Sequence, residues 1–255
     1  MRQYIAIFQK EWLESRRTYK LYLLLIFFLV SGMMSPLIAK LTPDIMTSFL
    51  PKGTLVSLPN PSALDSWAQF FKNITQTGLP LLILIYSGIV TTDLNKGTLV
   101  NLLTKGLSRP VVLLAKYSLL VLSWTINLAL SSLMTWGYTA YLFPNIALSH
   151  LFFSLFCLWL FGLLLLALLL FSSVLIPNGY GHLALLGGTL ILAFILNVIP
   201  KIGEKSPLRL VTSNLAIIQG KLSPSELNNV IFISLILTII FISGAIFFFR
   251  RHQIS

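Results

Sequence analysis

Charged side chains are scarce in this sequence. Asp, Glu, Lys and Arg together make up 10% of the 255 residues, whereas 56% are hydrophobic. A soluble domain carries about 25% charged residues, so this chain has too few of them to cover a water-exposed surface. The shortage excludes an ordinary soluble protein and indicates an integral membrane protein.

Cysteine and the residues of catalytic motifs are also scarce. Cys157 is the single cysteine, which excludes a disulfide framework and a cysteine-rich metal site. The sequence contains no GxxxxGK[ST] phosphate loop, no HExxH and no Gly-x-Ser-x-Gly elbow. The three histidines lie far apart, and none has a second ligand at helical spacing: His150, His182 and His252. We therefore expect no catalytic site, metal or cofactor on this chain itself.

The middle of every apolar run lacks acidic and basic residues. An intramembrane enzyme or an ion-coupled transporter normally needs ionisable groups at membrane depth. Both classes are therefore disfavoured, and any solute movement must draw its energy from another source. Uncharged polar residues do occur inside the runs, and we interpret them mainly as hydrogen-bonding groups between helices.

Positive charge is in excess, with a formal net charge of +11. The 18 basic residues lie almost entirely at the ends of apolar runs, which is typical of membrane orientation signals and not of nucleic-acid binding. If the N-terminus is cytoplasmic, 11 of them fall on the inner side and 7 on the outer side. The distribution predicts that both termini are cytoplasmic.

Charge-free stretches determine the number of membrane spans. The longest contains 84 residues between Lys116 and Lys201 and is interrupted by two turn signals, at 143–145 and 177–179. A span needs about 20 apolar residues, so this stretch divides into three. Continuous runs such as LLLLALLL at 163–170 favour helices over a barrel. We predict an all-α membrane domain over 1–255 with six spans: 20–39, 73–92, 111–142, 147–176, 181–199 and 228–249.

Two segments are predicted outside the membrane on the outer side. Residues 40–72 read as a Pro-rich loop, in which Ser62 caps a helix that continues into the second span. Residues 200–227 are too short to cross the membrane and too apolar for open solvent, so we expect short re-entrant or capping helices. The capping box from Ser223 to Glu226 predicts that the sixth helix begins near Pro224.

The N-terminal residues 1–19 are predicted to form an amphipathic helix over 2–17 that lies in the headgroup plane. Its apolar side recurs at three- and four-residue spacing: Tyr4, Ile5, Phe8 and Trp12. Its polar side carries three charged residues: Lys10, Glu14 and Arg17. The alternative is a solvated tail with scattered apolar residues, because Ile7 and Leu13 blur the two faces.

The inner loop at 93–110 contains a short predicted helix with an apolar ridge. After a break at Gly97, one side of this helix carries Leu99, Leu102 and Leu103, and Gly106 ends it. Either the helix folds back as a cap on the bundle, or it docks a cytoplasmic partner.

This loop resembles that of permeases of the ABC-2 type transporter family. The matching pattern is an acidic residue, a Gly-Thr-Leu triplet, an apolar pair, Ser-Arg and a later lysine: Asp93, Gly97-Thr98-Leu99, Leu102-Leu103, Ser108-Arg109 and Lys116. The acidic position is more often Glu in the family. The N-terminus is similar to the family's elbow helix, on the residues Lys10-Glu11-Trp12 and Arg16-Arg17.

The resemblance implies a bacterial ABC exporter subunit in the cell membrane. Such a chain forms the translocation path with a second permease chain, as a homodimer or heterodimer, and with two copies of an ABC ATP-binding subunit that bind ATP and Mg. It further implies that the loop Asp93–Arg109 couples to the ATPase and that Lys10–Arg17 is the elbow. A non-transporting immunity or sensor protein that sequesters a peptide is the alternative, and the sequence selects no substrate.

Overall fold

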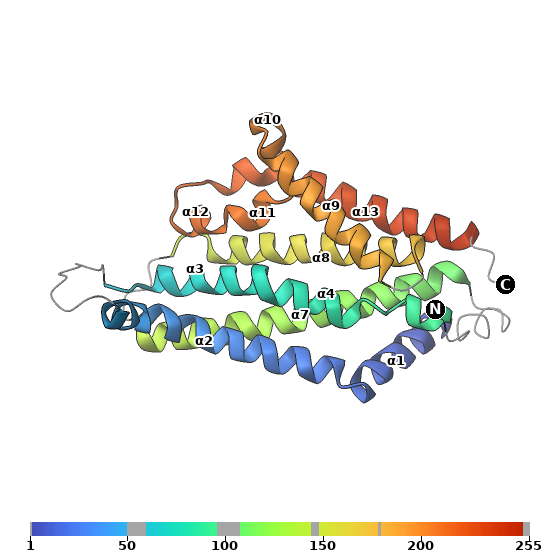
Figure 1. The fold of residues 1–255 in the computed structure, drawn as a ribbon, viewed down its shortest axis with the longest axis horizontal. Coiled ribbons are helices and arrows are strands. Elements are labelled where there is room, and N and C mark those ends of the chain that lie inside the picture. The colour runs from blue at the N-terminus through green and yellow to red at the C-terminus, as the bar shows by residue number, and fades with distance from the viewer. Residues whose placement is uncertain (1, 50–59, 96–107, 144–147, 178–179, 252–255) are drawn as a thin grey trace.

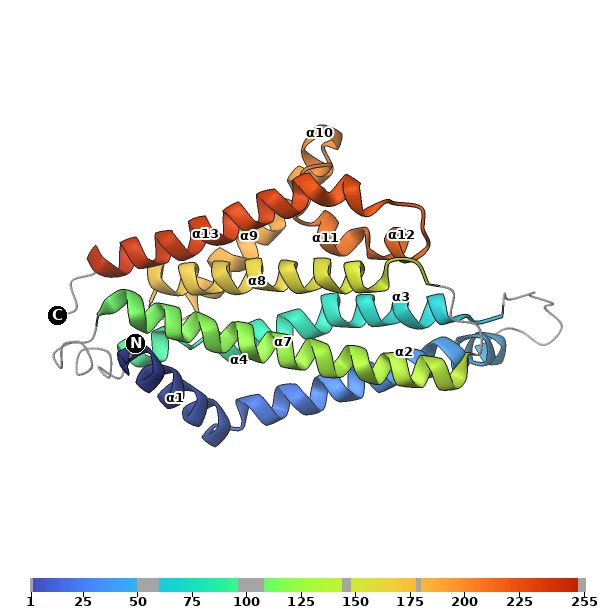
Figure 2. The same cartoon turned by 180° about the vertical axis from the view of Figure 1, so that it is seen from behind.

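The described part of the chain is a bundle of long helices that run side by side along its longest axis (Figures 1 and 2). The structure is a computed structural model, and it describes residues 2–49, 60–95, 108–143, 148–177 and 180–251. The first half contains α1 (Arg2–Arg17), α2 (Lys20–Phe49), α3 (Ala63–Asn73), α4 (Leu79–Tyr86) and α5 (Thr91–Asn95). The second half contains α7 (Arg109–Leu142), α8 (Leu151–Leu175), α9 (Gly181–Asn197), α10 (Pro200–Gly203), α11 (Arg209–Thr212), α12 (Asn214–Ile218) and α13 (Asn228–Arg251). The predicted all-helical class is confirmed for these residues.

Five helical segments are long and apolar enough to cross a membrane. They are Lys20–Pro43, Ala63–Asp93, Arg109–Leu142, Leu151–Leu175 and Pro224–Arg251. The remaining predicted span, 181–199, corresponds to α9, an apolar helix of 17 residues. At about 1.5 Å per residue, α9 is roughly 25 Å long, slightly short of the hydrocarbon thickness of about 30 Å. The six-span count therefore stays a prediction.

The segment at 40–72, predicted as an outer loop, differs from that prediction. Helix α2 continues to Phe49 and contains both Pro36 and Pro43, so the expectation that the helix ends at residue 39 is wrong. Proline is tolerated in long apolar helices because neighbouring groups can satisfy the freed carbonyls. The predicted start of the next helix is confirmed, because the Ser62 backbone N–H donates to Asp65 Oδ2 at 2.9 Å.

The second span is one helical rod with a local widening in its middle. Residues Ile74–Gly78 form a π-helical turn between α3 and α4, in which the Leu79 N–H donates to the Ile74 carbonyl. Pro80 follows directly and has no N–H to donate to the carbonyl one turn earlier. The proline ring also displaces that carbonyl, which explains why the helix widens here.

The segment at 200–227 forms short helices, as its apolar pattern predicts. α11 and α12 lie along α8, with Leu210, Ile217 and Ile218 buried. The Ile218 carbonyl accepts a hydrogen bond from the Ser149 N–H at 3.1 Å and so fixes the chain before α8. The predicted capping box is confirmed, because the Ser223 N–H donates to Glu226 Oε1 at 3.1 Å. A 3₁₀ turn at Pro224–Leu227 then leads into α13.

The core of the bundle lies around α7 and α8. α7 packs against α1, α2, α3 and α8, while α8 packs against α9, α11, α12 and α13. The two central helices approach closely at Gly162, where a Cβ atom would lie 2.3 Å from the Trp124 indole nitrogen. Trp124 itself is fully buried and donates to the Trp159 carbonyl at 3.0 Å. A side chain larger than hydrogen at 162 would therefore push α7 and α8 apart.

Candidate functional site: a buried charged cluster

Helix α1 turns a partly polar face toward the bundle. Ile7, Glu11 and Ser15 follow one another at four-residue spacing and are all buried, with 3–5% of their surfaces exposed. Tyr4, Phe8 and Trp12, predicted to form the apolar side of a helix in the headgroup plane, flank this face and pack against the core. Ile5, also predicted on the apolar side, is 53% exposed. The fold thereby places the Glu11 carboxylate inside the protein.

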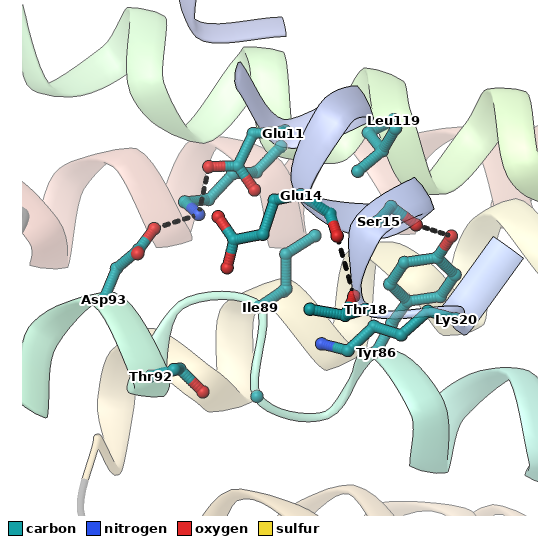
Figure 3. Close-up of a pocket in the computed structure, with 12 residues that line it drawn as sticks. Glu11, Glu14, Ser15, Thr18, Lys20, Tyr86, Ile89, Thr92, Asp93 and Leu119 are labelled. Carbon is teal, nitrogen blue, oxygen red and sulfur yellow. Dashed lines mark hydrogen bonds and ion pairs between the residues drawn. The ribbon is translucent and has the colours of Figure 1, made fainter. Parts of the chain in front are cut away.

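Lys116 of α7 neutralises this carboxylate from the opposite side. Its ammonium nitrogen lies 2.8 Å from Glu11 Oε1 and also hydrogen-bonds Asp93 Oδ2. Lys116 is 1% exposed, and Glu11 and Asp93 are each 5% exposed. Figure 3 shows the Glu11 and Asp93 side chains reaching toward the same nitrogen. Charges this deeply buried are tolerated only when each has a close partner of opposite sign.

Lys10 extends the group at its half-exposed edge. Its nitrogen lies 3.0 Å from Glu11 Oε1, 3.0 Å from Glu14 Oε2 and 3.3 Å from Asp93 Oδ1. Burial lowers the pKa of Lys10, but the carboxylates of Glu11, Glu14 and Asp93 together raise it above its ordinary value. Lys10 and Glu14, which the sequence places together on the polar side of α1, thus form an ion pair with each other. We call Lys10, Glu11, Glu14, Asp93 and Lys116 the charged cluster.

A small cavity of about 30 Å³ lies beside the charged cluster. It is large enough for about one water molecule, and Ser15, Tyr86 and Lys116 are among its lining residues. A hydrogen-bonded chain leads from it across α1, α4 and α7: Ser15 with Tyr86 at 3.1 Å, and Tyr86 with Ser123 at 3.1 Å. Within the described residues, no trio of His, Cys, Asp or Glu side chains is placed to hold a metal ion.

Arg109 forms a separate connection at the start of α7. One terminal guanidinium nitrogen donates to the Phe249 carbonyl at 3.0 Å and to the Arg250 carbonyl at 2.9 Å. Both carbonyls belong to the last turn of α13, where a helix lacks internal donors and its dipole favours a cation. Arg109 therefore caps α13.

The two ends of the loop at 93–110 thus contact different helices. Asp93 joins α1 and α7 through the charged cluster, whereas Arg109 joins α13. The middle of the loop lies outside the described residues, and with it the predicted Gly97, Thr98, Leu99, Leu102 and Leu103. Of the elbow residues, Lys10 and Glu11 join the cluster, Trp12 is half-buried, and Arg16 and Arg17 are exposed.

Sequence patterns single out Glu11, Asp93 and Lys116 separately but do not pair them. These patterns also give no signal for Tyr86 and Ser123, which extend the polar chain into the bundle. One available signal is the position of Lys116, which lies two turns inside a long apolar helix. A charge at that place needs an acidic partner, and Glu11 and Asp93 are two of only 7 acidic residues in the chain.

Comparison with known proteins gives the family. Residues 5–253 match the family described as "ABC-2 family transporter protein". A curated relative is the uncharacterized transmembrane protein YxlG of Bacillus subtilis (strain 168), 24% identical over 163 residues. That alignment covers 62% of this chain and 63% of the relative, so the match spans less than two thirds of the relative's length. No solved structure matches the chain. Because the family match covers nearly the whole sequence, this multi-pass membrane protein belongs to the ABC-2 transporter family.

Proposed function

We propose that this chain is the permease subunit of an ATP-driven exporter, that it forms the translocation path, and that a separate ATP-binding subunit drives it. Family membership implies an ATP-binding partner, and the chain has no phosphate loop of its own. In the proposed assembly, two ATP-binding subunits carry ATP and Mg, and a second permease chain completes the pathway. The membrane is the bacterial cell membrane, with both chain termini and the loop at 93–110 in the cytoplasm.

The charged cluster is the observation that carries the proposal. A loop that receives force from an ATPase must be attached rigidly to the helices that it moves. Asp93 provides such an attachment, because it is 5% exposed and bonded to lysines of both α1 and α7. Arg109 attaches the other end of the loop to α13. Displacement of the loop would thus move α1, α7 and α13 as packed elements, which suits a two-state transporter.

A co-purification experiment tests coupling. The chain is purified from its native membrane, and the bound ATP-binding subunit and the ATP hydrolysis of the complex are measured. Leu102→Asp/Leu103→Asp should release the partner, because docking would bury two carboxylates without partners. Asp93→Ala should leave the partner bound. It should lower ATP hydrolysis, but by less than the double variant does. Lys201→Gln, at an exposed position of α10, is the matched control and should behave like wild type.

Two outcomes would overturn the assignment. If no ATP-binding protein accompanies the wild-type chain, the immunity or sensor interpretation gains support. If the double Asp variant inserts and keeps full partner binding and hydrolysis, the loop only caps the bundle.

Orientation is tested by single cysteines in a Cys157→Ser background. A membrane-impermeant thiol reagent should label position 55 but not position 100 in intact cells, and the reverse pattern would contradict the proposed topology.

A further inference from the structure

The turn between α1 and α2 carries a concentration of positive charge. Arg16 and Arg17 end α1, and Lys20 begins α2. Arg16 and Arg17 are exposed, and Lys20 is half-buried. Figures 1 and 2 both show the junction of the two helices projecting from the side of the bundle. We call Arg16, Arg17 and Lys20 the basic elbow.

No described carboxylate neutralises the basic elbow. The two acidic residues of α1, Glu11 and Glu14, are already paired with Lys10 and Lys116 inside the charged cluster. Within the part of the chain that the structure describes, no Asp or Glu lies within ion-pair distance of the three elbow cations. Lys20 lines the cavity beside the charged cluster, whereas the positive charge of the exposed Arg16 and Arg17 is available to an external anionic partner.

The position of the elbow indicates what that partner is. The first apolar membrane segment begins at Lys20 itself, so the turn lies where hydrocarbon gives way to headgroups. Tyr19 and Tyr22 form an aromatic pair beside the cations, and Tyr19 is 73% exposed. Exposed tyrosines with lysine and arginine at the end of a span are typical of a headgroup contact.

The backbone of the turn has a defined conformation. Tyr19 has a φ of 59°, in the left-handed region, and this single residue reverses the chain from α1 into α2. The turn is held by hydrogen bonds from the Tyr19 N–H to the Arg16 carbonyl at 3.2 Å and from the Leu23 N–H to the Tyr19 carbonyl at 2.9 Å. The cations consequently share one fixed bend at the edge of the bundle.

We infer that the basic elbow is a docking surface for anionic phospholipid headgroups. The recognised chemistry is a lipid phosphate, and arginine matches it through paired N–H donors. The surface is independent of the proposed coupling to an ATPase, because it needs only the chain and lipid. Attraction to an anionic lipid surface should also weaken as salt screens the charges.

The purified full-length chain in detergent is titrated with phosphatidylglycerol or phosphatidylcholine, and bound lipid is counted by native mass spectrometry. Wild type should retain phosphatidylglycerol in preference to phosphatidylcholine. Arg16→Gln/Arg17→Gln should weaken phosphatidylglycerol retention about thirtyfold, at roughly fivefold for each charge removed near a headgroup. Arg16→Lys/Arg17→Lys should stay within a few-fold of wild type, because the charge remains.

The matched control is Lys201→Gln/Lys205→Gln, which removes two exposed positive charges next to Glu204 at α10. This control variant should lose little of its phosphatidylglycerol retention, because the Glu204 carboxylate already offsets part of the positive charge of the two lysines. An unchanged unfolding temperature verifies that each variant is folded. Inorganic phosphate should fail to displace the bound lipid, and displacement would indicate a free-phosphate site. Equal lipid retention by wild type and Arg16→Gln/Arg17→Gln, or equal losses in the elbow and control variants, would overturn the inference.

Discussion

Helices α8 and α13 are similar in apolar composition but differ in their surroundings. Both are almost entirely apolar, and both are long enough to cross a membrane. In the most apolar window of α8, 72% of residues are buried inside the chain, whereas only 22% are buried in the segment that contains α13. Apolar composition thus places both helices in a membrane but does not decide which of them forms the core. The same residue type should consequently respond differently to mutation in the packed centre and at the periphery.

Substitution of Lys116 should have the largest effect on the free energy of unfolding. Lys116→Met removes the buried cation between two buried carboxylates and should destabilise the folded chain by about 3–5 kcal/mol, because only the half-exposed Lys10 then offsets them. Thermal unfolding in detergent measures the effect. The variant Glu11→Gln/Asp93→Asn/Lys116→Met removes all three charges and should recover most of the loss. A Lys116→Met chain as stable as wild type would show that the cluster contributes no binding energy between α1, α5 and α7.

Truncation of an aliphatic side chain should destabilise the protein more in α8 than in α13. Leu166 of α8 is 0% exposed, and Ile239 of α13 is 63% exposed. Leu166→Ala should cost about 2–5 kcal/mol, because it leaves a cavity in the packed core. Ile239→Ala should stay within about 0.5 kcal/mol. Unfolding temperatures of the two variants make the comparison, and equal losses would mean that α13 is packed as tightly as α8, for instance by another chain.

Glycine substitutions test the same difference in packing by adding side-chain volume instead of removing it. Gly162→Ala should destabilise by about 1–3 kcal/mol, since the new Cβ would overlap the Trp124 ring. At Gly187 of α9, a Cβ would meet nothing within 4 Å. Gly187→Ala should therefore be neutral or slightly stabilising. Trp124 fluorescence and unfolding temperature check the pair, and tolerance of Gly162→Ala would show that α7 and α8 are not held at this distance.

Lys10 should give the smallest effect. Its side chain is 38% exposed, so Lys10→Met should cost less than about 1 kcal/mol. Because carboxylates raise its pKa in the folded chain, its contribution is complete below the ordinary lysine pKa of about 10.4 and is lost only as the pH rises through the folded value. The stability difference from wild type should thus be constant from about pH 6 to about pH 9. A contribution that disappears within this range would contradict the ion pairs of Lys10.

Local patterns predicted much of the fold because each depends on neighbouring residues. The N-terminal helix at 2–17, the helix start after Ser62 and the turn before α13 all follow from capping residues and helical spacing. The end of α2 was not predictable in the same way. Pro36 and Pro43 usually end a helix in water, whereas here α2 contains both.

The candidate site was predictable only as separate residues. Asp93, Lys10 and Glu11 stand out in sequence by their charge and by the family pattern. Their relation to Lys116 was not predictable, because Glu11 and Lys116 are 105 residues apart and meet only when α1 packs on α7. Arg109 and the α13 carbonyls are separated by 140 and 141 residues.

By itself, the sequence determined the class of protein, the approximate limits of its helices and the family resemblance. These properties depend on composition and on short-range spacing, which persist whatever the arrangement of the helices. The tertiary structure decided which apolar helix is central, which face of α1 is buried, and which lysine neutralises Glu11. Hydrophobic burial is non-directional, so many arrangements of similar apolar helices satisfy it. The close approach at Gly162 and the pairing of buried charges select one of them.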